Sequence, residues 1–319
     1  MTEAACSKTS FLEKLQSGQP LVTVELSPPK GTDTARLLRQ AEQLKGRVDA
    51  INVPDCQLAL LKMSSMATCK LIQEATGIET VWQLTCRDRN LLALQADIMG
   101  GYALGLRNIL ALTGDPVQLG DQKEVAKQVF HLDSVRLLDL LRYLNNGMDA
   151  TATVLPNGGT RFAVGSALNP FRLHNRAQQL RLQQKLECGV DFFQTQPVYS
   201  LEPIAEMLEA VTAASAMVGC PTPVVMTGII PPKSAEAARR MNHSVVGLNI
   251  PQSLIDLLER SEAPAIESLK FCADLVAKIQ PLNPHFHFMP VGMFKYMPDL
   301  LEECFKGQRV NASESKVLS

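Results

Sequence analysis

Eight short apolar runs alternate with longer stretches of helical spacing along nearly the whole chain. These runs are too short for helices and end at turn-forming residues, which is typical of buried parallel strands. They occupy residues 21–26, 48–53, 79–85, 106–112, 162–167, 191–196, 224–230 and 286–291. Eight strand–helix units in about 300 residues predict an α/β fold, the (β/α)8 or TIM barrel. A doubly wound open sheet is the alternative.

Three short helices are expected between the last two runs, where the other gaps hold one. Their spacing places them over residues 235–241, 252–260 and 265–279. No low-complexity linker and no repeat beyond the strand–helix alternation is visible, so a single barrel domain is expected over residues 1–306. The polar segment 307–319 is expected to be a disordered tail.

The charge balance and the composition exclude several classes of function. The chain has 31 basic and 32 acidic residues and a net charge of −1, which argues against nucleic-acid binding. No apolar run reaches the ~20 residues of a membrane span, and the polar N-terminus does not resemble a secretory signal. We therefore expect a cytoplasmic protein without membrane contact. The eight cysteines are scattered, with no Cys/His cluster at zinc spacing, so no metal site is expected.

The fourth run leads into Thr113-Gly114-Asp115-Pro116. Glycine lets the backbone approach a ligand closely, and proline stops the strand. Asp115 thus follows a buried strand at its carboxyl end, where parallel α/β folds place their chemistry. An Asx-type turn is the alternative. The polar segment 116–130 that follows is unusually long for a loop and is a candidate lid or binding loop.

Polar residues also end several of the other runs. The carboxyl ends of barrel strands converge on one mouth, so these side chains are expected to meet there. The amides among them suit a flat heterocycle, because each offers a donor beside an acceptor. The set is Glu25, Asn52, Asp55, Gln83, Thr85, Thr113, Asp115, Asn169, Gln194 and Gln196.

Glu25 and Gln196 interrupt apolar strands. Burial would raise the pKa of Glu25 and suit it to general-acid catalysis, unless its side chain faces outward or forms a salt bridge. An amide at Gln196 is costly to bury without a partner, and either a ligand or a neighbouring residue could be that partner.

Arg181 and Lys185 lie one turn apart on the expected helix after the fifth run. They could bind a phosphate, but a solvated helix face is the more common arrangement of such residues. His131 ends the polar loop just before a helix, and a surface position is its ordinary interpretation.

Several of these segments together resemble the 5,10-methylenetetrahydrofolate reductase family. They occur in the order of that family and cover nearly the whole chain. The matching pieces are Val22-Thr-Val-Glu25 with Pro28-Pro29, Leu84-Thr-Cys86, residues 108–116 with Leu-Thr-Gly-Asp, residues 191–196 with Thr-Gln, Gly228-Ile-Ile-Pro231 and Phe286-His-Phe288. The resemblance implies a flavin-bearing barrel that reduces 5,10-methylenetetrahydrofolate to 5-methyltetrahydrofolate, with FAD as cofactor and NADH or NADPH as a possible electron donor.

The resemblance also implies roles for individual residues. Glu25 is similar to the general acid that helps open the five-membered ring of the substrate. Asp115 is similar to the residue between flavin and pterin, and Gln196 to an amide that contacts the folate. The positions similar to flavin-binding residues are Asn52, Asp55, Gln83, Thr113, Gly114, Asp115, His131, Asn169, Arg181 and Lys185.

Four positions depart from the better-known bacterial members. Gln83 and Asn169 replace histidines, Thr113 replaces an arginine, and Met293 stands where those members carry an arginine for the folate tail. The departures resemble a divergent branch, similar to the reductase halves of bifunctional methyltransferase–reductases or to the reductases of acetogens. In such a branch a partner protein can replace the nicotinamide as electron donor. A homo-oligomer is also expected.

Two readings from other classes remain open. One is a flavin-free, pterin-binding barrel that passes a methyl group from methyltetrahydrofolate to a corrinoid. The other is a non-catalytic subunit that keeps the fold, against which the joint presence of Glu25 and Asp115 argues.

Overall fold

Eight parallel strands close into a barrel in sequence order in the computed structural model, which describes residues 10–244 and 248–305. Each strand pairs with the next one along the chain, and the eighth pairs with the first. The predicted (β/α)8 barrel is therefore confirmed. The strands are β1 (Val22–Glu25), β2 (Ala50–Val53), β3 (Glu79–Thr85), β4 (Asn108–Leu112), β5 (Ala163–Leu168), β6 (Phe192–Pro197), β7 (Val224–Ile229) and β8 (Phe286–Phe288).

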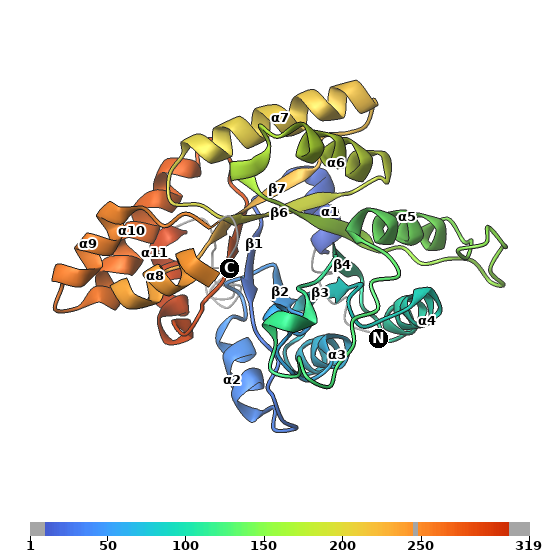
Figure 1. Cartoon of the computed structure of the whole chain (residues 1–319), viewed down its shortest axis with the longest axis horizontal. Helices are drawn as coiled ribbons and strands as arrows, with labels where there is room; N and C mark the ends of the chain where they lie inside the picture. Colours follow the sequence, from blue (N-terminus) through green and yellow to red (C-terminus); the bar gives the residue numbers. More distant parts are fainter. Residues whose placement is uncertain (1–9, 245–247, 306–319) are drawn as a thin grey trace, which may run out of the picture.

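Helices surround this barrel in a ring (Figure 1). Three of them, α8, α9 and α10, precede β8, as the sequence predicted. The helices are α1 (Phe11–Ser17), α2 (Ala35–Gln43), α3 (Ser65–Thr76), α4 (Leu91–Ala103), α5 (Ser134–Asn145), α6 (Arg176–Glu187), α7 (Glu202–Val218), α8 (Ala235–Ser244), α9 (Gln252–Arg260), α10 (Pro264–Ile279) and α11 (Met297–Cys304), with short 3-10 turns η1 (Gln57–Ala59), η2 (Val117–Leu119), η3 (Pro170–Arg172) and η4 (Phe294–Tyr296).

The amino end of the barrel is filled by apolar side chains and closed by α1. Phe11 of α1 packs edge-on against Phe192 of β6, with ring centroids 5.6 Å apart. Phe192 fills the barrel so completely that a Cβ on Gly165 of β5 would lie 2.3 Å from its ring. Since this end is packed shut, any ligand must enter at the carboxyl ends of the strands.

Polar groups fasten α1 to this end. The backbone N–H of Phe11 donates to Glu79 Oε1 over 2.9 Å, and Asn108 Nδ2 donates to the other oxygen of that carboxylate. Ser10 and Glu13 form a capping box that begins the helix. The plug at the bottom is thus held by directed hydrogen bonds as well as by apolar contact.

The main differences from the sequence predictions concern element ends. Helix α3 begins at Ser65, later than expected, because the Ser64 hydroxyl accepts from the N–H of Ala67 and caps it there. Segment 116–130 is a loop except for the short turn η2. The predicted tail, residues 307–319, lies outside the described residues. Within the described ranges, no helix has the length and apolar character needed to cross a membrane.

Candidate active site

Glu25 lies at the carboxyl end of β1, with its side chain inside the barrel mouth. Gln83 of β3 donates from Nε2 to Glu25 Oε2 over 3.0 Å. Loss of hydration raises the pKa of this carboxyl to about 7, while the hydrogen bond from Gln83 opposes the rise. The expected buried acid is therefore present, and it forms no salt bridge among the described residues.

A second pair of amides spans the barrel just inside the mouth. Asn52 of β2 donates from Nδ2 to Gln194 Oε1 of β6 over 2.8 Å, and both side chains are buried. Asn52 Oδ1 is buried without a hydrogen-bond partner among the described residues. An orphaned buried acceptor is costly, so this atom is a natural contact for a ligand donor.

His287 lies in the barrel interior below these amides. Its Nδ1 is 2.9 Å from Thr23 Oγ1. Burial lowers the pKa of His287 to about 3, so its ring is neutral in the physiological range. The histidine is a core residue and carries no charge into the mouth.

Asp115 follows β4 and is held by the loop after β2. Its Oδ2 accepts from the N–H of Leu58 over 2.7 Å. That loop contains three residues with positive φ, Cys56 (48°), Leu58 (54°) and Ala59 (54°), which is a strained arrangement for side chains other than glycine. The strained turn therefore aims a backbone donor at the Asp115 carboxylate.

The same turn connects Asp115 to the surroundings of Glu25. Gln57 Nε2 donates to the Ser27 hydroxyl over 3.0 Å, and both residues line a cleft together with Glu25. The two acids thus lie on opposite sides of η1 at one mouth, as the sequence prediction required.

Asp55 occupies a buried network beneath this turn. Its Oδ2 accepts from the N–H and hydroxyl of Thr85 and from Arg89 Nη1, at 3.2, 2.8 and 2.7 Å. The carboxylate is therefore fully engaged with protein donors, and its contribution to a ligand site is to hold the loops in place.

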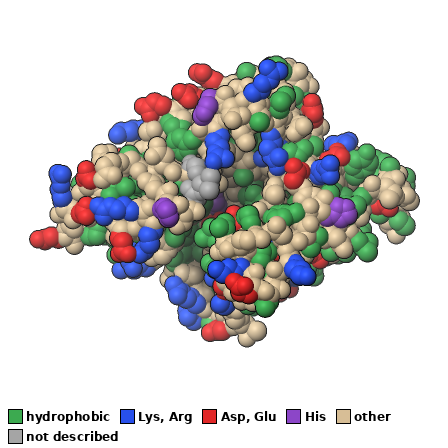
Figure 2. Space-filling model, viewed as in Figure 1, with side chains coloured by type: hydrophobic (Ala, Val, Ile, Leu, Met, Phe, Trp, Pro, Cys, Tyr) green, Lys and Arg blue, Asp and Glu red, His purple; other side chains and the backbone are tan. Residues whose placement is uncertain are grey.

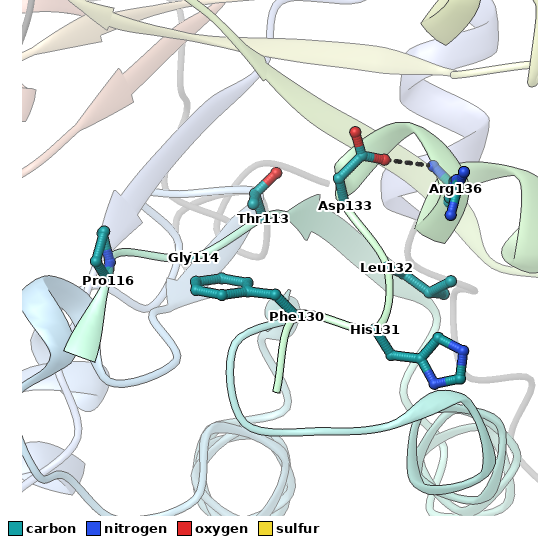
Figure 3. Close-up of a pocket in the computed structure, with 8 residues that line it drawn as sticks. All are labelled: Thr113, Gly114, Pro116, Phe130, His131, Leu132, Asp133 and Arg136. Carbon is teal, nitrogen blue, oxygen red and sulfur yellow. Dashed lines mark hydrogen bonds between the residues drawn. The ribbon is translucent and has the colours of Figure 1, made fainter. Parts of the chain in front are cut away.

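Thr113 and Gly114 line a cavity of about 440 Å³ beside α5 (Figure 3). Thr113 Oγ1 accepts from the N–H of Ser134 over 3.1 Å. The ring of Phe130 lies next to Gly114, and Asp133 and Arg136 close the far side. Gly114 has a φ of +96°, and a Cβ there would lie 3.0 Å from Thr85 Cβ, so only glycine suits this position.

His131 lines the same cavity but is exposed, and its ring turns away from Phe130 toward α4 (Figure 3). Its Nδ1 lies 3.3 Å from the backbone N–H of Leu91, which donates to it. The surface position expected from the sequence is what the structure has.

Arg181 and Lys185 of α6 do not form a solvated helix face. Arg181 donates to the Ser134 hydroxyl over 3.0 Å and pairs with Asp133 at 3.2 Å. Lys185 is buried and donates to the carbonyl of Ala167 over 2.6 Å. Burial, with help from the nearby Arg181 charge, lowers the pKa of Lys185 to about 8.

Two predicted residues have a different environment. Asn169 accepts from the N–H of Phe171 and caps η3, so its side chain is partly used by the backbone. Gln196 is half-buried, and its amide has no hydrogen-bond partner among the described residues. Of the predicted set, Gln196 and Asn52 Oδ1 therefore keep the most free hydrogen-bonding capacity.

A larger cleft of about 870 Å³ extends from Glu25 between α2 and the segment after β8. Figure 2 shows a hollow at the centre of this face, with Lys and Arg side chains around it. The basic residues of the cleft were missed by the sequence analysis, since no local motif joins them. They are Arg36, Arg39, Lys62 and Lys295.

The fold and this mouth define a class of protein: a closed parallel (β/α)8 barrel that gathers a carboxyl of near-neutral pKa, several amides and a second acid at its carboxyl end. The chain belongs to the methylenetetrahydrofolate reductase family, because the model of the family described as "Methylenetetrahydrofolate reductase" matches residues 10–304. The resemblance inferred from the ordered motifs is thereby confirmed.

Curated relatives carry the same family name. The chain is 28% identical over 228 residues to methylenetetrahydrofolate reductase 2 of Saccharomyces cerevisiae, covering 67% of this chain and 34% of that protein. It is 23% identical over 307 residues to methylenetetrahydrofolate reductase 2 of Schizosaccharomyces pombe, covering 89% of this chain and 45% of that protein. The chain thus spans less than half the length of these relatives.

A solved structure shares the barrel. It is an uncharacterized protein from Clostridium thermocellum that binds two copies of 5-methyl-5,6,7,8-tetrahydrofolic acid. The two align with a TM-score of 0.63 and 14% identity over 91% of this chain and 97% of that chain. At this identity the likeness shows the fold alone.

Proposed function

We propose that this protein reduces 5,10-methylenetetrahydrofolate to 5-methyltetrahydrofolate, with Glu25 as the general acid. The observation that carries the proposal is the carboxyl of Glu25 at the barrel mouth, with a pKa of about 7. A group that is half protonated near neutrality can deliver a proton and regain it in each turnover. Membership of the reductase family supports the reaction class.

Glu25 would protonate a ring nitrogen of the bridged substrate, which makes opening of the five-membered ring easier. Gln83 would hold the carboxyl in one orientation through its 3.0 Å hydrogen bond. A fixed donor removes much of the entropic cost of aligning acid and substrate.

Asp115, Gln196 and Asn52 would bind the pterin. The paired donors and acceptors of a pterin edge match a carboxylate and amides. Gln196 and the Oδ1 atom of Asn52 have hydrogen-bonding capacity that no described residue uses. Asp115 already accepts from Leu58, so its second oxygen would face the ligand.

The residues beside the mouth fit FAD. A Cβ at Gly114 would lie 3.0 and 3.1 Å from the Cβ atoms of Thr85 and Arg87, so glycine keeps a backbone surface open to a flat ring. Arg181 and Lys185 offer positive charge suited to a diphosphate. Thr113, Gly114, His131, Asn169, Arg181 and Lys185 would hold the cofactor, with Asp55 and Gln83 supporting the surrounding loops. FAD, when bound, would supply the hydride that completes the reduction.

The electron donor is NADH, NADPH or a partner protein. The departures at Gln83, Thr113 and Asn169 from better-known bacterial members support testing all three. Anaerobic reduction of the purified protein's chromophore with NADH, NADPH or a reduced ferredoxin distinguishes them.

The two half-reactions provide the test of the proposal. The wild-type protein should be yellow, its chromophore should be bleached by a donor, and methylenetetrahydrofolate should restore the colour. Glu25→Gln should keep the bleaching step and lose folate reduction by about 10² or more, as loss of a general acid requires. Glu42→Gln, which changes an exposed carboxylate of α2, is the control and should behave as wild type.

Loss of both half-reactions in Glu25→Gln would contradict the acid role. A colourless protein that still binds 5-methyltetrahydrofolate would contradict the reductase proposal. That result would instead support the flavin-free methyl-transfer alternative.

A further inference from the structure

The cleft beside Glu25 has one acidic end and one basic wall. Glu25 lies at the barrel end, and helix α2 forms a side. Arg36, Arg39, Gln40 and Gln43 of α2 all line it, at the spacing of a single helix face. Seven residues of helix correspond to roughly 10 Å, so this polar stripe leads well away from the mouth.

The positive charge along this cleft is not neutralised within the protein. Among residues 10–244 and 248–305, none of Arg36, Arg39, Lys62 and Lys295 forms an ion pair. Lys295 lies over the ring of Tyr296, 4.4 Å from its centroid, and keeps its charge. These four cations come from α2, from the loop before α3 and from η4, so folding brings them together.

The two acids that line the cleft do not balance these cations. Glu25 is largely neutral up to a pH of about 7 and is hydrogen-bonded to Gln83. Asp33 accepts from the N–H of Ala35 through Oδ1 and lies at the entry to α2. The wall therefore suits a ligand that carries several negative charges at the end remote from the mouth.

Met293 does not contribute to this wall. Its side chain is fully buried, so it cannot be a contact for an acidic ligand. Lys295, two residues further on, lines the cleft instead. The charge that could meet an acidic tail has thus moved to the rim formed by α2, Lys62 and Lys295.

We propose that this cleft binds the glutamyl tail of the folate and selects forms with several γ-linked glutamates. The inference rests on the proposed folate function and deepens it. With the pterin at Glu25, the tail runs along α2, and each added glutamyl residue brings one more carboxylate to a wall of unpaired cations. An exposed ion pair contributes at most about fivefold in affinity, so selection by about tenfold needs two or more of them.

The test compares ligands that differ only in the tail. Dissociation constants of 5-methyltetrahydrofolate and of its γ-triglutamate are measured by calorimetry on the full chain, at low salt and at physiological salt. The wild type should bind the triglutamate about tenfold more tightly, and salt should reduce this preference, since exposed charges are screened. The double variant Arg36→Gln/Arg39→Gln should lower the preference to about twofold and leave monoglutamate binding within about threefold.

A control double variant removes two arginines elsewhere. Arg240→Gln/Arg260→Gln alters α8 and α9, which line neither cavity, and should keep the wild-type preference. Lys62→Gln/Lys295→Gln tests the same wall from two other segments if the α2 variant fails to fold. It should lower the preference in the same way.

Failure of this inference differs from failure of the proposed function. A protein that prefers the triglutamate but does not reduce methylenetetrahydrofolate would refute the function and leave the tail site standing. Equal binding of both ligands by the wild type would refute the tail site, whatever the reduction assay gives. Equal loss of both ligands in the α2 variant, or an unchanged preference, would also refute it.

Discussion

Gln83 on β3 donates a hydrogen bond from Nε2 to Oε2 of Glu25 on β1, over 3.0 Å across the barrel mouth. The two residues lie 58 positions apart in the chain. Loss of hydration favours the neutral form of Glu25, whereas a donated hydrogen bond favours the charged form. The pKa of about 7 is the balance of these two effects, with loss of hydration the larger.

Removing the Gln83 donor should raise the pKa of Glu25 further. Glu25 must be protonated to act as an acid, so the rate of folate reduction should fall as the pH rises through about 7 in the wild type. In Gln83→Met the midpoint of this fall should move to higher pH, because a group that stabilised the carboxylate is gone. The pH profile of single-turnover folate reduction measures the shift.

Gln194→Met serves as the control for this shift. Gln194 is an amide of the same mouth that bonds to Asn52 and not to Glu25, so its loss should leave the midpoint near 7. An unchanged midpoint in Gln83→Met would mean that another group sets the pH dependence.

Burial of Glu25 should also destabilise the protein at alkaline pH. Its folded-state pKa of about 7 exceeds its ordinary value of 4.5, so the folded state binds the proton more tightly. The stabilising contribution of this group is complete below pH 4.5 and is lost as the pH rises through 7. Glu25→Gln should therefore raise the free energy of unfolding at pH 8 by up to about 3 kcal/mol and have little effect at pH 4.5.

Denaturant unfolding at the two pH values measures this difference. Glu42→Gln changes an exposed carboxylate of α2 and should show no such gain. If Glu25→Gln had the same stability relative to wild type at both pH values, Glu25 would not be a buried acid of raised pKa.

Asp115→Asn should weaken folate binding and alter the reduction potential of the bound flavin. Asparagine keeps an oxygen that can accept from the N–H of Leu58, so the turn should stay in place. The lost negative charge should be felt by the two heterocycles instead. Folate titration and a redox titration of the chromophore measure the two effects.

The neighbouring acid Asp121 provides a matched comparison. Asp121 also accepts from this turn, at the N–H of Leu61, and pairs with Lys30 at 2.6 Å. Asp121→Asn should affect neither folate binding nor the potential. Wild-type behaviour of Asp115→Asn in both titrations would remove Asp115 from the site.

Gln196→Ala should raise the dissociation constant of the folate by about tenfold, which corresponds to the loss of one or two hydrogen bonds. Gln184→Ala on the exposed end of α6 is the control and should leave folate binding unchanged. A constant that stays at the wild-type value in Gln196→Ala would assign this amide to the structure of the barrel rather than to the ligand.

Gly165→Ala should destabilise the barrel core by about 3 kcal/mol, because its Cβ would lie 2.3–2.7 Å from the ring of Phe192. Gly100→Ala on α4 meets no atom within 4 Å and should be neutral or stabilising by up to about 1 kcal/mol. Thermal unfolding compares the two variants. The double variant Gly165→Ala/Phe192→Leu should recover part of the loss, and failure to do so would place the strain elsewhere.

The strand order and the positions of Glu25 and Asp115 at strand ends follow from the sequence alone. The apolar runs and their turn residues are local signals, since each strand of a buried parallel sheet is apolar along its own length. Their number and alternation with helices predict the barrel, and the barrel brings strand ends to one mouth. The ordered motifs carried the family in the same way.

Tertiary structure alone decided which of these polar residues are free to meet a ligand. Asp55 is consumed by Thr85 and Arg89, and Lys185 by the carbonyl of Ala167, whereas Gln196 keeps its amide. The burial of Met293, and the wall that unites Arg36 with Lys295, likewise require the closed barrel. Such pairings join residues far apart in the chain, and their geometry depends on strand register and loop packing, which no local pattern of residues encodes.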